Sequence, residues 1–205
     1  MAMRLRKALE DGNGMPFAGP VEPDETYIGG KRKNMSLAKR KELKGAGRGT
    51  VGKEAMVGVK DRDTNRVRST IVPVTDAPHV TGFVATQAED GAKVYTDEDK
   101  VYNALKPFYD HEAVNHGVGE FVRGMAHTIG MESFRSMLKR GYIGTLHKMS
   151  PKHLDKYVAE FSERHNVRDA DTIAQMEGVV VGMNGKHLRY SDLTADNGLP
   201  SGARR

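Results

Sequence analysis

The sequence predicts an α/β fold in which one mixed sheet is flanked by helices. Short β-rich runs fill most of the chain up to residue 117, whereas amphipathic helical runs dominate the remainder. In the first part the order is three strands, a helix, a strand, a helix and a strand, which is typical of one sheet covered by helices. A length of 205 residues suits one such domain and suffices to bury a sizeable core.

The strands are marked by runs of β-branched and aromatic residues. The runs EAMVGVKD and VRSTIVPV are separated by DRDTNR, which is the pattern of a β-hairpin. The run VEPDETYIGG ends in two glycines and predicts a strand that leads into a loop. The expected strands are 21–30, 54–61, 67–74, 92–98 and 111–117.

The clearest helix is expected at residues 150–166. Ser150 can serve as its N-cap, Pro151 suits the first helical position, and apolar residues then repeat at i, i+3, i+4 and i+7. A helix over 125–141 can end at Gly141. The other expected helices are 77–89, 99–108 and 171–183.

Positive charge is concentrated in one segment. Residues 31–53 hold nine Lys or Arg against one acid, Glu42, although the whole chain carries a net charge of only +5. A basic segment on a mildly acidic body predicts a polyanionic partner, and a solvated loop is the alternative. We expect this segment to be a mobile loop that contacts such a polyanion.

The composition excludes several classes of protein. With no cysteine, the chain has no disulfide framework, zinc ribbon or thiol nucleophile. No apolar run is long enough to cross a membrane, and the N-terminal residues lack the apolar region of a signal peptide. We therefore expect a cytoplasmic protein.

Two motif matches are rejected. GRGTVGKE, at 47–54, fits the start of a phosphate-binding P-loop, but Glu54 stands where the magnesium-binding Ser or Thr is required and no strand precedes it. HEAVNH, at 111–116, has its histidines five apart on an expected strand, whereas a zinc site of this kind needs them four apart on a helix.

Three acids occupy positions from which they could hold metal ions. Asp24 is in the first expected strand, Asp97 ends the fourth, and Glu132 lies on the 125–141 helix. Carboxylates from separate segments can hold two Mg²⁺ ions that activate a nucleophile for phosphodiester displacement. Lys139, two turns after Glu132, shares its helix face and can meet a backbone phosphate. Each acid alone is more simply a solvated side chain, so only the combination favours a site.

The chain resembles the ISXO-like DDE transposase domain of bacterial insertion sequences. The resemblance is carried by VEPDETYIGGK, GRGTVGK, VYTDE, VNHGVGEFVRGMAHTIGMESFRSMLKRGY, GTLHKMSPKHLDKYVAEFSERHNVR and MNGKHLRYSDL. These stretches cover roughly residues 21–195 and are far more specific as a set than any one motif.

The resemblance implies a ribonuclease H-like fold and Mg²⁺-dependent cutting and joining of DNA, with two ions for which Mn²⁺ can substitute. By position, the catalytic and metal-binding acids would be Asp24, Asp97 and Glu132. The partners would be transposon ends and target DNA, bound by a homodimer or larger assembly in the bacterial nucleoid, with no membrane. The residues expected to contact DNA are Arg32, Lys39, Arg40, Lys41, Arg48, Lys53, Lys139 and Arg140.

The chain departs from the family pattern at three places. Members usually have Asn where this chain has Ile129, and in some subgroups that Asn is treated as the third catalytic residue. Members usually have Trp at the position of Arg135. They also carry an upstream zinc-ribbon or helix-turn-helix region, for which the residues before Val21 leave no room.

The expected organisation is a loosely ordered segment (1–20), a ribonuclease H-like catalytic domain (21–168), and a helical extension with a flexible tail (169–205). Two other functions stay open: an inactive DNA-binding remnant of a transposase, and another ribonuclease H-like nuclease. Metal-dependent nicking that Asp24→Ala or Asp97→Ala abolishes separates the first from an active enzyme. Cleavage of junctions or hybrids without joining would indicate the second.

Overall fold

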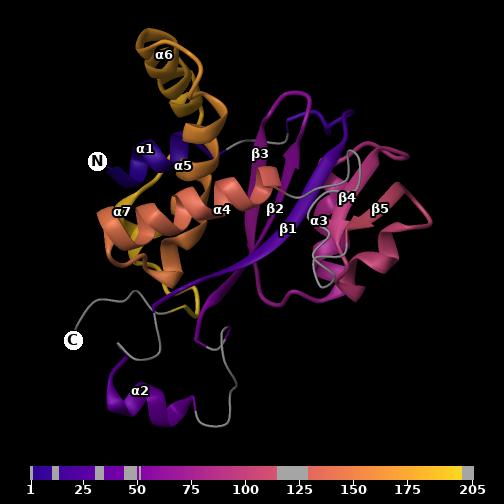
Figure 1. Cartoon of the computed structure of the whole chain (residues 1–205). Helices are drawn as coiled ribbons and strands as arrows, with labels where there is room; N and C mark the ends of the chain where they lie inside the picture. The colour runs from indigo at the N-terminus through magenta and orange to yellow at the C-terminus, as the bar shows by residue number, and fades with distance from the viewer. Residues whose placement is uncertain are drawn as a thin grey trace.

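The structure is a computed structural model that describes residues 2–10, 14–30, 35–43, 50, 52–114 and 129–199. Its centre is a five-stranded mixed sheet with the strand order β3-β2-β1-β4-β5 (Figure 1). β2 runs antiparallel to both β1 and β3, whereas β4 runs parallel to β1 and β5 parallel to β4. The strands are β1 (Val21–Ile28), β2 (Glu54–Asp61), β3 (Val67–Val72), β4 (Lys93–Asp97) and β5 (Asp110–Val114).

The order and direction of the strands confirm the expected α/β fold with a ribonuclease H-like mixed sheet. The hairpin expected around DRDTNR joins β2 to β3, where Lys60 pairs with Val67. HEAVNH begins inside β5, as expected for a strand rather than a metal-binding helix. Residues 115–117 of the fifth expected strand lie outside the described part of the chain.

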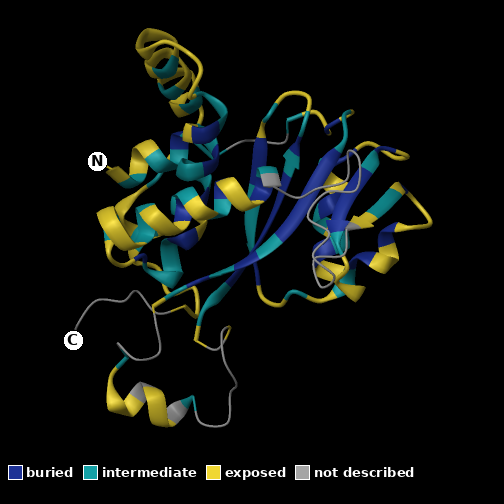
Figure 2. Cartoon of the chain, in the orientation of Figure 1, coloured by how far each residue is buried: buried dark blue, intermediate teal, exposed yellow. Residues whose placement is uncertain are grey.

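β1 is the central strand and is buried along most of its length (Figure 2). Its side chains alternate between two cores, because successive residues of a strand face opposite sides of the sheet. Val21 belongs to the core on one face, together with Val57 and Val84. Ile28 belongs to the core on the other face, together with Phe134. Glu22, Asp24 and Thr26 therefore lie on the second face, although all three are polar.

The first face is covered by α3 (Ala77–Gln87) and the 3₁₀ helix η2 (Lys100–Leu105). α3 begins at Asp76, whose carboxylate accepts the backbone N–H of His79 at 3.1 Å. η2 replaces most of the helix expected at 99–108, and Asp99 caps it by accepting the N–H of Val101 at 3.0 Å. The tighter 3₁₀ form suits a piece of this length.

The second face is covered by α4 (Ile129–Gly141) and α5 (Leu154–Asn166). The expected 125–141 helix is described from Ile129 onward, and it continues past Gly141 as a π-helical turn, η4 (Tyr142–Leu146). Ser150 occupies the expected N-cap position with Pro151 directly after it, but the first turn is a 3₁₀ turn, η5 (Pro151–His153), that leads straight into α5 at Leu154. Ser150 makes no side-chain cap bond to that turn.

Both chain ends contribute helices. α1 (Ala2–Ala8) packs on α5, where the Arg6 guanidinium lies 4.2 Å from the centre of the Tyr157 ring and pairs with Glu160 at 2.6 Å. The segment expected to be loosely ordered is thus partly helical, because α5 supplies an aromatic ring and a carboxylate for it. The division of the chain at residues 20 and 168 stays a prediction.

The remaining helices are α2 (Leu37–Glu42), α6 (Thr172–Met183) and α7 (Tyr190–Thr194). α2 shows that part of the basic segment, expected to be a loop, is helical. α6 projects from the body of the molecule in Figure 1 and is largely exposed in Figure 2. Among the described residues no helix is long and apolar enough to cross a membrane.

Candidate active site

Asp24 and Asp97 lie on neighbouring parallel strands at the same level of the sheet. Val21 of β1 is aligned with Val94 of β4, and each aspartate follows three residues later. Val21 and Val94 both face the α3 core, so the two aspartates face the opposite side, which α4 covers. The sheet therefore brings together the two acids that the sequence singled out on strands.

The carboxylate of Asp24 is held in an unfavourable electrostatic environment. Only 9% of this residue is exposed, and burial raises its pKa from 3.8 to about 6. The charge of Asp97 also raises the pKa, whereas pairing with Arg135 lowers it. Two carboxylates that repel each other in a partly buried site are stabilised when a cation binds between them.

The cation that meets Asp24 in the structure is Arg135. Its Nη1 donates a hydrogen bond to Oδ2 of Asp24 at 2.5 Å. Burial works against the guanidinium charge, but Asp24 and then Glu132 outweigh it and raise the pKa of Arg135. The side chain at the position where the family usually has Trp thus contacts the first predicted metal ligand.

Glu132 lies in the first turn of α4, one turn before Arg135, and is exposed. Within the described residues, no three His, Cys, Asp or Glu side chains form a group that could hold a metal ion. The α4 side chain that reaches Asp24 is Arg135 rather than Glu132. The convergence of all three acids on one metal stays a prediction.

Glu22 fixes the start of α4, a role that the sequence did not indicate. It is 1% exposed and accepts a hydrogen bond from Nε of Arg62 at 2.5 Å and one from the backbone N–H of Met131 at 3.2 Å. A carboxylate is well placed there, because the N–H groups of the first helical turn are otherwise unsatisfied. The approach is close: a Cβ on Gly130 would lie 2.8 Å from Oε2 of Glu22.

Arg62 connects this anchor to the neighbouring strand. Its guanidinium lies 3.9 Å from the centre of the Tyr95 ring on β4, and it pairs with Glu22 on β1. Glu22 and Asp24 are two residues apart on β1, so they face the same side of the sheet. The strand that carries Asp24 therefore also positions the helix that carries Glu132 and Arg135.

A further acid near the site, Glu25, is partly buried and also escaped the sequence analysis. Burial raises its pKa; the Tyr102 hydroxyl, which donates a hydrogen bond to it, lowers the pKa, and Asp97 and Asp24 raise it. In the sequence Glu25 is one of three acids close together, and nothing distinguishes it from a solvated neighbour of Asp24.

Lys139 lies near the site together with Lys53. Burial and the nearby charge of Arg135 lower the pKa of Lys139, Asp24 raises it, and Lys53 lowers it. The expected proximity of Lys139 to the acids thus has support in its electrostatic surroundings. A cluster of cations beside buried acids suits the backbone of a nucleic acid.

Comparison with known proteins identifies the family. Residues 16–166 match the family model described as the ISXO2-like transposase domain. The chain belongs to this family. It is also 27% identical over 156 residues to a protein of Halobacterium salinarum described as an uncharacterized protein in transposable element ISH50. That match covers 73% of this chain and 53% of the relative, so the chain spans about half of that protein.

The other residues expected to contact DNA in this transposase domain are placed unevenly. Arg32 and Arg48 lie outside the described residues, and for Lys39 only the backbone, within α2, is described. Arg40, Lys41 and Arg140 are exposed. Ile129 is the first residue of α4, and its side chain lies outside the described part.

The donor set of the transposase domain fits a hard divalent cation in part. Asp24 and Asp97 offer oxygen ligands on adjacent strands, and the raised pKa of Asp24 reflects an environment that a cation would relieve. Within the described residues Glu132 does not form a three-ligand group with the two aspartates, and Arg135 occupies one of the two oxygens of Asp24.

Proposed function

We propose that this transposase domain cleaves and joins DNA strands at the ends of an insertion sequence. The observation that carries the proposal is the placement of Asp24 and Asp97 at one level of β1 and β4, facing the helix that bears Glu132. Membership of the ISXO2-like family supports the same reaction class. Synapsis of two DNA ends would require two or more copies of the chain.

The two aspartates would hold Mg²⁺, with Glu132 as a third ligand. A metal bound there lowers the pKa of a coordinated water or 3′ hydroxyl and stabilises the leaving oxygen. Asp24 must be ionised for this, although burial favours its neutral form. Lys139 would hold the phosphate beside the acids, because it is an exposed cation on α4 whose pKa responds to the charge of Asp24.

Arg135 would compete with a metal ion for Asp24, because its guanidinium neutralises the carboxylate and occupies Oδ2, and a metal that displaced it would free the guanidinium. Its guanidinium would then be available to the DNA backbone, for which a planar fork of donors is well suited. In this proposal Arg135 exchanges one anion, Asp24, for another, a phosphate.

Strand cleavage with divalent metal tests the function. Purified protein should convert supercoiled plasmid to the nicked form with Mg²⁺ or Mn²⁺, and it should join a pre-cut element end to a target strand. Asp24→Asn and Asp97→Asn should abolish both reactions, whereas Asp90→Asn, which changes an exposed acid before β4, should leave them intact. Nicking that survives Asp24→Asn and Asp97→Asn would exclude this site as the source.

A second candidate, a non-catalytic DNA-binding remnant, is favoured by the ion pair between Arg135 and Asp24. In that case the chain binds DNA with metal-independent affinity and no variant restores cleavage. Recovery of cleavage on Arg135→Trp, which installs the usual residue of the family, would instead show an impaired enzyme.

A further inference from the structure

Helix α1 and the segment after α6 enclose a hollow of about 390 Å³ whose charged lining is entirely basic. We call it the end hollow, because both end regions of the chain form it. Its basic residues are Arg4, Lys7, Lys186, His187 and Arg189. The rest of its lining is apolar, and the acid that meets one of its cations, Glu10 beside Lys7, is not itself part of the lining.

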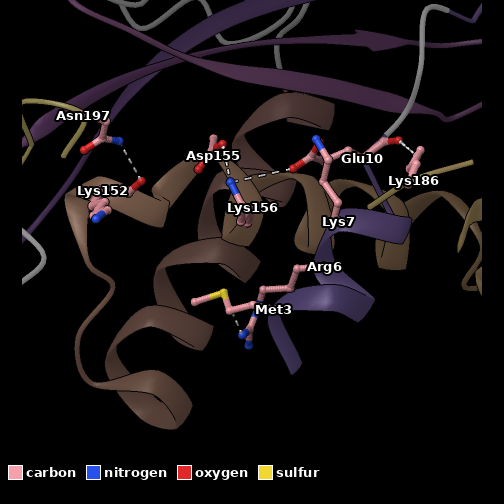
Figure 3. Close-up of polar contacts among 9 residues, drawn as sticks. All are labelled: Met3, Arg6, Lys7, Glu10, Lys152, Asp155, Lys156, Lys186 and Asn197. Atoms are coloured by element: carbon pink, nitrogen blue, oxygen red, sulfur yellow. Dashed lines mark hydrogen bonds and ion pairs between the residues drawn. The ribbon is translucent and has the colours of Figure 1, made fainter. Parts of the chain in front are cut away.

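The end hollow is built by specific contacts between the two segments. Nζ of Lys186 donates a hydrogen bond to the carbonyl oxygen of Ala8 at 3.1 Å, at the C-terminal end of α1. It donates another to the carbonyl oxygen of Glu10 at 2.5 Å (Figure 3). A cation is stabilised at that end by the unsatisfied carbonyls. Gly182 allows the close approach, because a Cβ there would lie 2.5 Å from the Ala8 oxygen.

The two arginines of the end hollow differ from its lysines in their partners. Lys7 pairs with Glu10, and Lys186 is engaged by the carbonyls of α1. Arg4 and Arg189 are exposed, and within the described part of the chain no carboxylate pairs with either guanidinium. Glu10 and Asp192, which accepts the backbone N–H of Arg189 at 2.7 Å, offset part of the positive charge at the rim. The five basic side chains of the lining exceed these two acids, and such an excess of positive charge in a recess attracts polyanions.

We propose that the end hollow binds the phosphodiester backbone of DNA, as a contact separate from the catalytic face. The proposal rests on the proposed function, which supplies DNA as the polyanion. Guanidinium groups bind phosphate oxygens through two donors, and Arg4 and Arg189 can both present theirs in this way. Residues 2–8 and 183–189 fall outside the family match at 16–166, so the site extends the DNA-binding surface beyond the matched domain. In Figure 1, α1, α6 and α7 lie at the end of the molecule opposite β5.

Binding of a duplex oligonucleotide, measured by fluorescence anisotropy over a series of salt concentrations, tests the end hollow. The full chain is compared with the double variant Arg4→Gln/Arg189→Gln and with a control, Arg66→Gln/Lys106→Gln, which removes two exposed charges outside the end hollow. Neither pair should change the melting temperature much, since exposed substitutions are usually close to neutral. The Arg4→Gln/Arg189→Gln protein, called the hollow variant, should bind DNA more weakly. The salt slope, meaning the slope of log K against log salt concentration, should become shallower by about 1.8, because each phosphate that is no longer neutralised reduces it by about 0.9.

A normal slope in the control together with a reduced slope in the hollow variant supports the proposal. An unchanged slope in the hollow variant, or an equal decrease in both variants, overturns it. Loss of self-association in sedimentation with an unchanged slope also overturns it, because the hollow would then hold an acidic segment of a second copy. If the unaltered chain binds no DNA even at low salt, the proposed function itself fails. If the unaltered chain cleaves DNA and the salt slope of the hollow variant is unchanged, the end-hollow proposal fails while the proposed function stands.

Discussion

Replacement of Arg135 by Gln should strengthen the binding of divalent metal. Gln keeps a hydrogen-bond donor near Asp24 but removes the positive charge that now neutralises it. A hydrogen bond between charged groups contributes about 1.5–3 kcal/mol. The Arg135 and Asp24 side chains are 29% and 11% exposed, so solvent screens the pair in part and about 1–2 kcal/mol is a suitable range. Since about 1.4 kcal/mol corresponds to a factor of ten, the dissociation constant for metal should fall by roughly 5- to 30-fold.

Titration calorimetry with Mn²⁺ and Mg²⁺ measures this change without any reliance on catalysis. Arg140→Gln is the matched control, because it removes an exposed cation from the same helix five residues later. Because Arg140→Gln only removes one positive charge from the same helix, it should raise the affinity for metal only slightly. Without metal, Arg135→Gln should also unfold at a lower temperature, since Asp24 and Asp97 then repel each other without a counter-charge. Equal increases in affinity in both variants would refute the reasoning, and metal binding that survives Asp24→Asn would place the metal elsewhere.

The remaining predictions concern protonation and helix position. Because the pKa of Asp24 is raised to about 6 from 3.8, the unfolding free energy of the metal-free protein should fall as pH rises from about 4 to 6. Asp24→Asn should flatten that dependence in urea titrations, and metal affinity should fall as pH drops through the same window. Glu22→Gln removes one charge from the mostly buried ion pair with Arg62, which should cost about 3–5 kcal/mol. At about 2–4 °C per kcal/mol for a chain of this size, calorimetry should show a melting temperature lowered by about 6–20 °C. Partial recovery in Glu22→Gln/Arg62→Met is expected, and an additive decrease would argue against the pairing. Ile129→Asn should raise cleavage about ten-fold or more if that position supports the metal; no increase, with Glu132→Gln inactive, would leave Glu132 as the third ligand.

The sequence predicted the sheet well, because its signals were local. The turn residues of DRDTNR marked the β2–β3 hairpin, and the apolar spacing of α3 and α5 marked the faces that cover the sheet. Asp24 and Asp97 were found because both stand on β-rich runs, and the parallel pairing of β1 with β4 then aligns them. The docking of α1 was missed because it depends on Tyr157 and Glu160, which are remote in sequence.

The contacts that shape the site were less accessible to sequence reasoning. Arg135 and Asp24 are separated by 111 residues, and the sequence showed Arg135 only as a departure from the family pattern. Glu22 looked like a flanking acid, because its role depends on the entry of α4 above β1. Both contacts arise from side chains that meet only after the sheet has formed.

The anchoring of α4 by Glu22 has a consequence for how the family can vary. The register of the helix on the sheet is set by a residue of β1 that lies two positions from Asp24, roughly 7 Å along the strand. Loss of the carboxylate at position 22 should therefore displace Glu132 and Arg135 relative to Asp24 even in a chain that keeps all three residues. A relative of this chain can then carry every expected catalytic acid and still have a misaligned site, so residue 22 has to be inspected together with those acids.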